Sequence, residues 1–165
     1  MIEKVLKAAV GAIERLGYRA CEEFSFESGE LEGALVCVSA GECRCMDPGM
    51  GRYLGFREEA DGSFTEIFGK RLEPELIFRV YAPFGEKGAG LCREVCGALC
   101  GMERFFPSGL RLLELDGGEM EAVEALAAYC VVCRAKCAAV FLAETVSEDE
   151  EFLDFVLKGD VEGVK

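Results

Sequence analysis

Apolar residues at the start of the chain recur at the spacing of an amphipathic helix. They lie three or four positions apart, with charged residues such as Glu3, Lys4 and Glu14 between them. This spacing places the apolar side chains on one face of a helix. The pattern predicts a first helix that ends at Gly17 and covers the chain's own sheet rather than a partner's groove. The apolar positions are Ile2, Val5, Leu6, Ala9, Ile13 and Leu16.

The next part of the chain has the patterns of short strands. Residues 21–26 read as extended, and the Val-rich segment 34–40 predicts a buried strand. Residues 52–59 and 63–71 alternate apolar and polar side chains on either side of an Asp61-Gly62 turn, which predicts a hairpin. Residues 75–81 predict a separate strand that ends at Pro83. An irregular loop is expected over 41–51 because Pro48 and Gly49 end regular structure.

The second half predicts another helix and strand and leaves one segment open. Residues 89–100 have helical spacing and stop at Gly101, and residues 110–115 predict a strand. Over 126–142, the Ala content and the Cys spacing favour a helix, whereas the Val residues and a two-residue alternation favour a strand. Periodicity does not decide between them. The whole pattern predicts an α+β fold in which two helices pack on one face of a mixed or antiparallel sheet of about four to six strands.

Composition and charge limit the classes of function. The 165 residues are 51% hydrophobic and carry a net charge of −13, which suits a folded domain and repels nucleic-acid phosphates. The chain has no His, so Ser-His-Asp and Cys-His catalysis and His-ligated zinc sites are excluded. No acidic residue stands in a pattern that singles out a general acid or base. We therefore expect no enzyme, no cofactor and no tightly bound nucleic acid.

The sequence also predicts where the protein resides. Its longest apolar run, 125–133, is far shorter than the roughly 20 residues that cross a bilayer. Its first residues alternate apolar and charged side chains, unlike a signal peptide. We expect a protein that does not contact membranes and stays in a reducing cytoplasm.

Ten cysteines are the most unusual feature of the composition. A reducing compartment argues against a disulfide framework. Cys92, Cys96 and Cys100 fall at helical spacing on an apolar stripe, where free Cys acts as a small hydrophobic residue. We interpret most cysteines as core residues. The alternative is a metal-binding or thiol-redox protein whose ligands come from two segments, namely Cys43, Cys45, Cys130, Cys133 and Cys137.

The C-terminal segment differs from the rest of the chain. Residues 148–151 are all acidic, and an apolar group that includes Phe152, Phe155 and Val156 follows them. Solvated charge followed by apolar residues is a pattern of docking segments, although packing on the same domain explains it equally well. We predict one α+β domain over 1–144 and an acidic arm over 145–165.

The order of these elements resembles a known family. A leading amphipathic helix, the segment 76–83 (LIFRVYAP), a Gly-rich turn into a Cys-bearing helix, 106–109 (FPSG) and 112–119 (LLELDGGE) are similar to the tail-terminator and neck proteins of tailed phages and prophages. The resemblance covers about 1–144, and the Cys richness and the acidic arm depart from it. It implies that 130–144 is a strand that closes the sheet.

The resemblance also implies a function. Such proteins form a homo-oligomeric ring that joins the tail tube to the connector, without catalysis. It implies assembly in the bacterial cytoplasm and then residence in the virion, with itself, tail-tube proteins and connector proteins as partners. We expect the contact residues in the loop over 41–51 and in the arm: Met46, Pro48, Met50, Phe152, Phe155 and Val156.

Overall fold

The computed structural model describes residues 2–22, 31–46 and 53–146, which form an α+β fold. In chain order the elements are α1 (Ile2–Arg15), β1 (Arg19–Cys21), β2 (Leu35–Met46), β3 (Tyr53–Glu58), β4 (Phe64–Pro83), α2 (Gly88–Leu99), the 3-10 helix η1 (Met102–Phe105), β5 (Leu110–Val123), the 3-10 helix η2 (Glu124–Leu126) and β6 (Ala128–Val146). The predicted fold class, with its N-terminal helix and second helix, is confirmed.

The six strands form one mixed sheet. Its order is β1-β2-β4-β6-β5, and β3 pairs with β4 beside this path. The β1–β2 pair is parallel, whereas β2–β4, β3–β4 and β5–β6 are antiparallel. The number of strands and the mixed character agree with the prediction.

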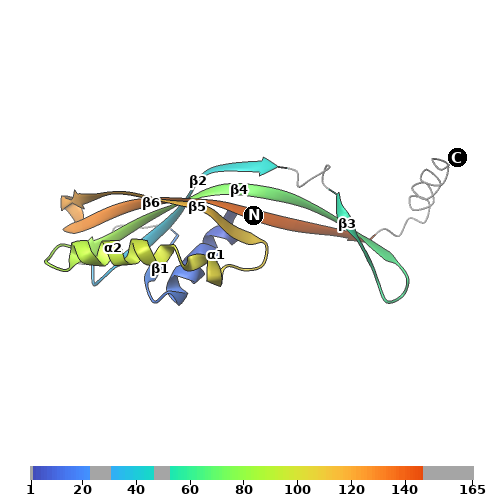
Figure 1. Cartoon of the computed structure of the whole chain (residues 1–165), viewed down its shortest axis with the longest axis horizontal. Coiled ribbons are helices and arrows are strands. Elements are labelled where there is room, and N and C mark those ends of the chain that lie inside the picture. Colours follow the sequence, from blue (N-terminus) through green and yellow to red (C-terminus); the bar gives the residue numbers. More distant parts are fainter. Residues whose placement is uncertain (1, 23–30, 47–52, 147–165) are drawn as a thin grey trace. The chain divides into compact units, whose positions relative to one another are not determined.

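Both α-helices lie on the same side of the sheet (Figure 1). α1 buries Val5, Ala9 and Ile13, and α2 buries Val95 and Leu99, as their helical spacing predicted. They pack on side chains that alternate along the strands, which are Val36, Val38, Leu76, Phe78, Val80, Cys133, Ala135 and Cys137. Each buried Val, Leu, Ile or Phe side chain contributes about 1.5–3 kcal/mol to stability. This helix-covered face therefore holds the hydrophobic core.

The chain leaves α1 through a glycine turn. Gly17 has a φ of +92°, and its N–H donates to the carbonyl oxygen of Glu14. A left-handed residue just after a helix is strongly favoured to be Gly because it has no Cβ. Gly17 thus ends the helix as the sequence predicted, and the chain turns into β1.

β4 corrects two of the sequence predictions. Residues 63–71 and 75–81 were expected as separate strands, but β4 runs through both and includes a buried Pro74. Pro74 pairs with Cys43 of β2, where the register of β2 shifts between Ala40 and Cys43. A missing N–H is tolerated at such an irregularity, so the proline does not end the strand. The same pairing makes 41–46 part of β2, where a loop was expected.

β6 settles the segment that periodicity left open. Residues 128–146 form a strand, as the family resemblance implied. Cys133, Ala135 and Cys137 are buried, whereas Arg134 and Lys136 between them are exposed. The Ala and Cys content reflects small side chains on the helix-covered face rather than helix propensity.

The chain divides into two units. One comprises Met1–Met46 and Arg71–Phe141, and the other comprises Asp47–Lys70 and Leu142–Lys165. In the second unit, β3 and residues 64–68 of β4 form the predicted hairpin. Its turn is closed by Asp61 Oδ1, which accepts hydrogen bonds from the Ser63 N–H and hydroxyl, and Gly62 adopts a φ of +84°. The predicted arm over 145–165 lies almost entirely outside the described residues.

Among the helices that the structure describes, none is long and apolar enough to cross a bilayer.

Candidate functional site

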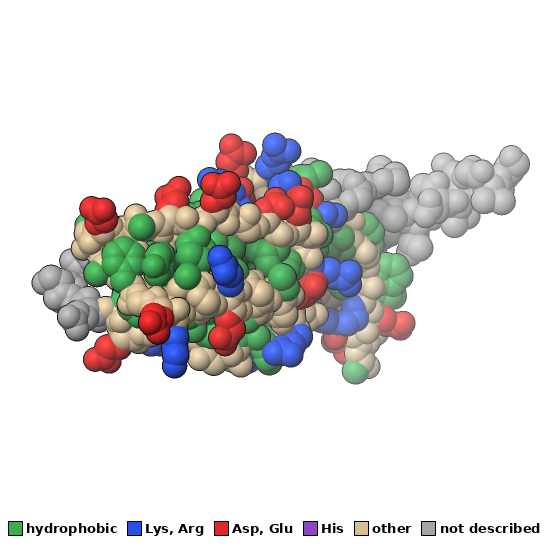
Figure 2. Space-filling view, turned by 60° about the vertical axis from the view of Figure 1, so that its left-hand side comes forward, with side chains coloured by type: hydrophobic (Ala, Val, Ile, Leu, Met, Phe, Trp, Pro, Cys, Tyr) green, Lys and Arg blue, Asp and Glu red, His purple; other side chains and the backbone are tan. Residues whose placement is uncertain are grey.

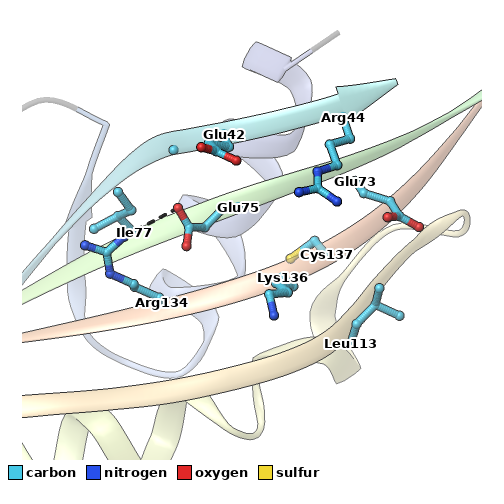
Figure 3. Close-up of a pocket in the computed structure, with 10 residues that line it drawn as sticks. Glu42, Arg44, Glu73, Glu75, Ile77, Leu113, Arg134, Lys136 and Cys137 are labelled. Atoms are coloured by element: carbon cyan, nitrogen blue, oxygen red, sulfur yellow. Dashed lines mark ion pairs between the residues drawn. The ribbon is translucent and has the colours of Figure 1, made fainter. Parts of the chain in front are cut away.

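A groove lies on the face of the sheet opposite the helices, which we call the open face. The groove has a volume of about 720 Å³. Its side chains rise from four strands, with the helices behind them (Figure 3). They are Glu42 and Arg44 from β2, Glu73, Glu75 and Ile77 from β4, Leu113 from β5, and Arg134 and Lys136 from β6, and Gly41 and Cys137 also line the groove.

The charges in the groove nearly balance. Arg134 pairs with Glu75 at 3.6 Å, and Lys136 pairs with Glu114 beside the groove at 2.6 Å, which raises the pKa of Lys136. Exposed pairs of this kind contribute little to stability. Arg44 forms no ion pair with any described residue, so its guanidinium is available to an incoming carboxylate. Because positive and negative side chains are mixed in the groove, it is better suited to bind a protein surface than a phosphate group.

The hairpin of the second unit carries an aromatic face, which we define as Tyr53, Phe56, Phe64 and Phe68. Tyr53 lies opposite Phe68, and Phe56 lies opposite Glu66. Glu66 is two positions from Phe64 and two positions from Phe68 along β4. Because opposite residues and residues two apart in a strand point to the same side, all four aromatic side chains lie on one side of the hairpin. Their rings meet edge to face, with centroids 5.7 Å apart for Tyr53–Phe68 and 5.5 Å apart for Phe56–Phe64.

Much of this aromatic face is exposed. Phe56 is 62% exposed and Tyr53 44% exposed. A two-stranded hairpin is marginally stable alone in water, and exposed apolar clusters mark interaction surfaces. The aromatic face is therefore a candidate contact with another protein.

Of the six contact residues expected from the sequence, one lies in the described part of the chain. Met46 is 47% exposed, as a contact residue requires, but it ends β2 and pairs with Arg71 rather than lying in a loop. The other five, Pro48, Met50, Phe152, Phe155 and Val156, lie outside the described residues.

The aromatic face was not predicted from the sequence. Part of the signal was present, because aromatic residues stand on both sides of the Asp61-Gly62 turn, although at unequal distances from it. Aromatic residues in both strands of a hairpin predict contacts between rings, but the register that decides which rings meet includes a shift between Tyr53 and Gly55.

The cysteines proposed as a ligand set are not brought together. Cys43 and Cys45 are exposed on β2, and Cys130 is buried on the open face. Cys133 and Cys137 belong to the helix-covered core. Over residues 2–22, 31–46 and 53–141, no three Cys, Asp or Glu side chains form a group that fits a metal ion.

Two pairs of thiols do approach each other. Sγ of Cys21 lies 3.6 Å from Sγ of Cys37, and Sγ of Cys133 lies 3.6 Å from Sγ of Cys96. All four residues are free thiols. Burial raises the pKa of Cys37 to about 12, with a further contribution from Cys21.

In the Cys96–Cys133 pair, the pKa of the more buried thiol is lowered, whereas in the Cys21–Cys37 pair it is raised. Its hydrogen bond with Cys96 lowers the pKa of Cys133 to about 7, and the backbone N–H of Gly118 adds to this effect. The same hydrogen bond raises the pKa of Cys96. Because an N–H can only donate, its position beside Cys133 favours the thiolate there and the proton on Cys96.

Charged side chains of both signs are dispersed over one face of the molecule. On the face shown in Figure 2, a band of hydrophobic side chains runs between acidic and basic side chains that are interspersed along its margins. No basic patch of the kind that grips a phosphate backbone is visible on that face.

Comparison of the chain with protein-family models found no matching family, and comparison with curated proteins found no match.

Proposed function

We propose that this protein is a non-enzymatic structural component of a phage or prophage-like particle. In this proposal it is a tail-terminator or neck protein that forms a homo-oligomeric ring between the tail tube and the connector. The observation that carries the proposal is the exposed aromatic face of the β3–β4 hairpin, which lies in a different unit of the chain from the groove. The order of the chain's helices and strands resembles that of tail-terminator and neck proteins, and this resemblance is the reason for proposing a phage or prophage-like particle.

The two surfaces suit each other chemically. The groove offers Ile77 and the exposed Leu113 to the aromatic rings. Glu58 follows Phe56 on the same side of the hairpin, because it pairs with Phe64. Glu58 supplies a carboxylate for Arg44, which has no ion-pair partner within the described part of the chain. In the proposed contact, the aromatic face of one copy occupies the groove of the next.

Such a contact is heterologous, since each copy uses two different surfaces. Heterologous contacts close into a ring when the rotation per subunit divides the circle, and otherwise continue as a filament. A ring needs no catalytic residue. The net charge of −13 is compatible with a lumen along which DNA moves without adhering.

Native mass spectrometry of the reduced protein, together with negative-stain electron microscopy, tests the proposal. We expect a closed ring without bound metal. Phe56→Ser removes the most exposed ring of the aromatic face and should leave monomers. Val140→Ser is the matched control, because Val140 is 40% exposed but belongs to neither surface, and it should still form the ring.

Mixing two variants tests the head-to-tail arrangement. Phe56→Ser has a defective aromatic face, and Arg44→Glu has a defective groove, so each alone should remain monomeric. Together they retain one working contact and should form a dimer that cannot grow. A wild-type protein that stays monomeric at every concentration contradicts the proposal, as does a single subunit with stoichiometric zinc or iron.

A further inference from the structure

Cys96 and Cys133 form a close thiol pair, and neither residue lines the groove or belongs to the aromatic face. Cys96 stands on α2 and Cys133 on β6, and their sulfur atoms are 3.6 Å apart. A disulfide bond is about 2.05 Å long, so the two sulfur atoms need to approach by only about 1.5 Å. The side chains already point toward each other across the interface between the helix and the sheet.

The two thiols differ in access and in surroundings. Cys96 is partly exposed on α2, whereas Cys133 is 2% exposed. The backbone N–H of Gly118 donates to Cys133 and stabilises a thiolate there. Cys92, a neutral thiol on α2, also faces the pair. The pair thus combines one accessible sulfur atom with one buried sulfur atom that carries negative charge readily.

We propose that Cys96 and Cys133 are a dithiol modification site that low-molecular-weight disulfides convert into an intramolecular disulfide. Cys96 is the residue that meets the reagent, and Cys133 is the resolving residue. This inference does not rest on the proposed function.

The reaction balances with two protein thiols and one external disulfide, RSSR. Cys133 first releases its proton to solvent, and as Cys96 attacks, the Cys96 proton passes along the hydrogen bond to the Cys133 thiolate. Cys96 Sγ attacks RSSR, so a Cys96–SR bond forms, the RS–SR bond breaks and RS⁻ leaves. Cys133 gives its proton to that RS⁻, and its thiolate attacks Cys96 Sγ. The second RS⁻ leaves and takes a proton from solvent, so the protein loses two electrons and RSSR becomes two RSH.

The Cys21–Cys37 pair serves as an internal comparison. Its sulfur atoms are also 3.6 Å apart, on the parallel neighbours β1 and β2. Burial and two neighbouring thiols, Cys21 and Cys130, disfavour a thiolate at Cys37. Because the resolving thiol attacks as a thiolate, Cys37 should close a disulfide with Cys21 more slowly than Cys133 closes one with Cys96.

Peptide mapping of the full chain tests the proposal. The reduced protein is treated with glutathione disulfide, the remaining thiols are blocked with N-ethylmaleimide, and the tryptic peptides are sequenced by mass spectrometry. We expect a Cys96–Cys133 link in the wild type to form before any Cys21–Cys37 link. Cys100→Ser is the matched control, because Cys100 is an exposed cysteine on the same tryptic peptide as Cys96, and the link should form at the wild-type rate.

Two variants separate the roles of the thiols. Cys133→Ser should trap a stable glutathione adduct on Cys96, because the resolving thiol is gone. Cys96→Ser should leave Cys133 free of glutathione, because Cys133 is buried. If either variant does not fold, the wild-type map alone decides. The proposal is wrong if Cys96 and Cys133 stay blockable while exposed Cys43 reacts, or if Cys96 keeps its glutathione in the wild type.

Discussion

Cys130 and Cys133 stand three residues apart on β6 and point to opposite faces of the sheet. Cys133 contacts Cys96 beneath α2, whereas Cys130 hydrogen-bonds with Tyr81 on the open face. Successive side chains of a strand alternate between its faces, so a Cys-x-x-Cys spacing that forms a metal knuckle in a turn separates its sulfur atoms in a strand. The spacing that suggested a ligand set is therefore a consequence of packing on both faces.

This arrangement predicts the outcome of replacing Cys133. Cys133→Ser should leave the metal content of the purified protein unchanged and lower the free energy of unfolding by about 1–3 kcal/mol, because a hydroxyl replaces a buried thiol. Native mass spectrometry reports the metal, and urea unfolding under reducing conditions reports the stability. Loss of a stoichiometric zinc ion in the variant would restore the ligand hypothesis.

The ionisation of the thiols predicts two separate steps in a pH titration. Cys133 has a pKa of about 7, below its ordinary value of 9.0, so one thiolate should form as the pH rises through neutrality. Cys37, whose pKa is about 12, should ionise only in strong alkali. Ultraviolet absorbance of the thiolate measures both steps. The neutral step should vanish in Cys133→Ser and persist in Cys37→Ser.

The same pKa values set the direction of the effect of pH on stability. The depressed pKa of Cys133 stabilises the fold above its ordinary pKa, and this contribution is lost as the pH falls through about 7. The raised pKa of Cys37 stabilises the fold below its ordinary pKa, and this contribution is lost as the pH rises through about 12. A Cys37→Ser variant that loses stability at the same alkaline pH as the wild type would contradict the second assignment.

Two phenylalanines with opposite exposure predict different costs of truncation. Phe78 is fully buried in the core, so Phe78→Ala should lower the free energy of unfolding by about 3–5 kcal/mol. Phe56 is 62% exposed, so Phe56→Ala should cost far less stability in the monomer. Denaturant unfolding of dilute protein measures both. Equal costs would mean that the hairpin is part of the same folding unit as the core.

Adjacent glycines on β5 provide a matched pair. A Cβ on Gly118 would collide with the backbone carbonyl of Val132, whereas a Cβ on Gly117 would meet nothing within 4 Å. Gly118→Ala should therefore cost about 1–3 kcal/mol through overpacking, and Gly117→Ala should cost much less. Alanine keeps the backbone N–H that Gly118 donates to Cys133, so the neutral thiolate step should shift in Gly118→Ala only where the collision displaces that N–H. Equal losses of stability in the two variants would contradict the predicted collision.

The sequence predicted elements whose signal is local. The apolar stripe and Gly17 define α1, and Asp61-Gly62 defines the hairpin turn, because in each case neighbouring residues determine the geometry. The length of β4 was not predictable in this way. Pro74 is a strand-ending signal on its own, and only the register shift in β2, a distant segment, makes room for it.

The candidate site was harder to predict from the sequence than the fold, because its residues come from segments far apart in the chain. The groove combines side chains from β2, β4, β5 and β6, and no local pattern reports which strands become neighbours. The Cys96–Cys133 pair joins residues 37 positions apart. Met46 was named from an expected loop, and although it is exposed, the structure places it at the end of β2.

The two ends of the strand order, β1 and β5, are both poor templates for a further strand. β1 has only three residues, and β5 is interrupted by register shifts between Leu112 and Glu114 and between Gly117 and Met120. Short or bulged edges hinder the addition of a foreign strand, which is how many β-proteins avoid amyloid-like aggregation. A ring subunit that accumulates to high concentration before assembly would benefit from this protection, because its copies would meet through side chains and not through backbone pairing.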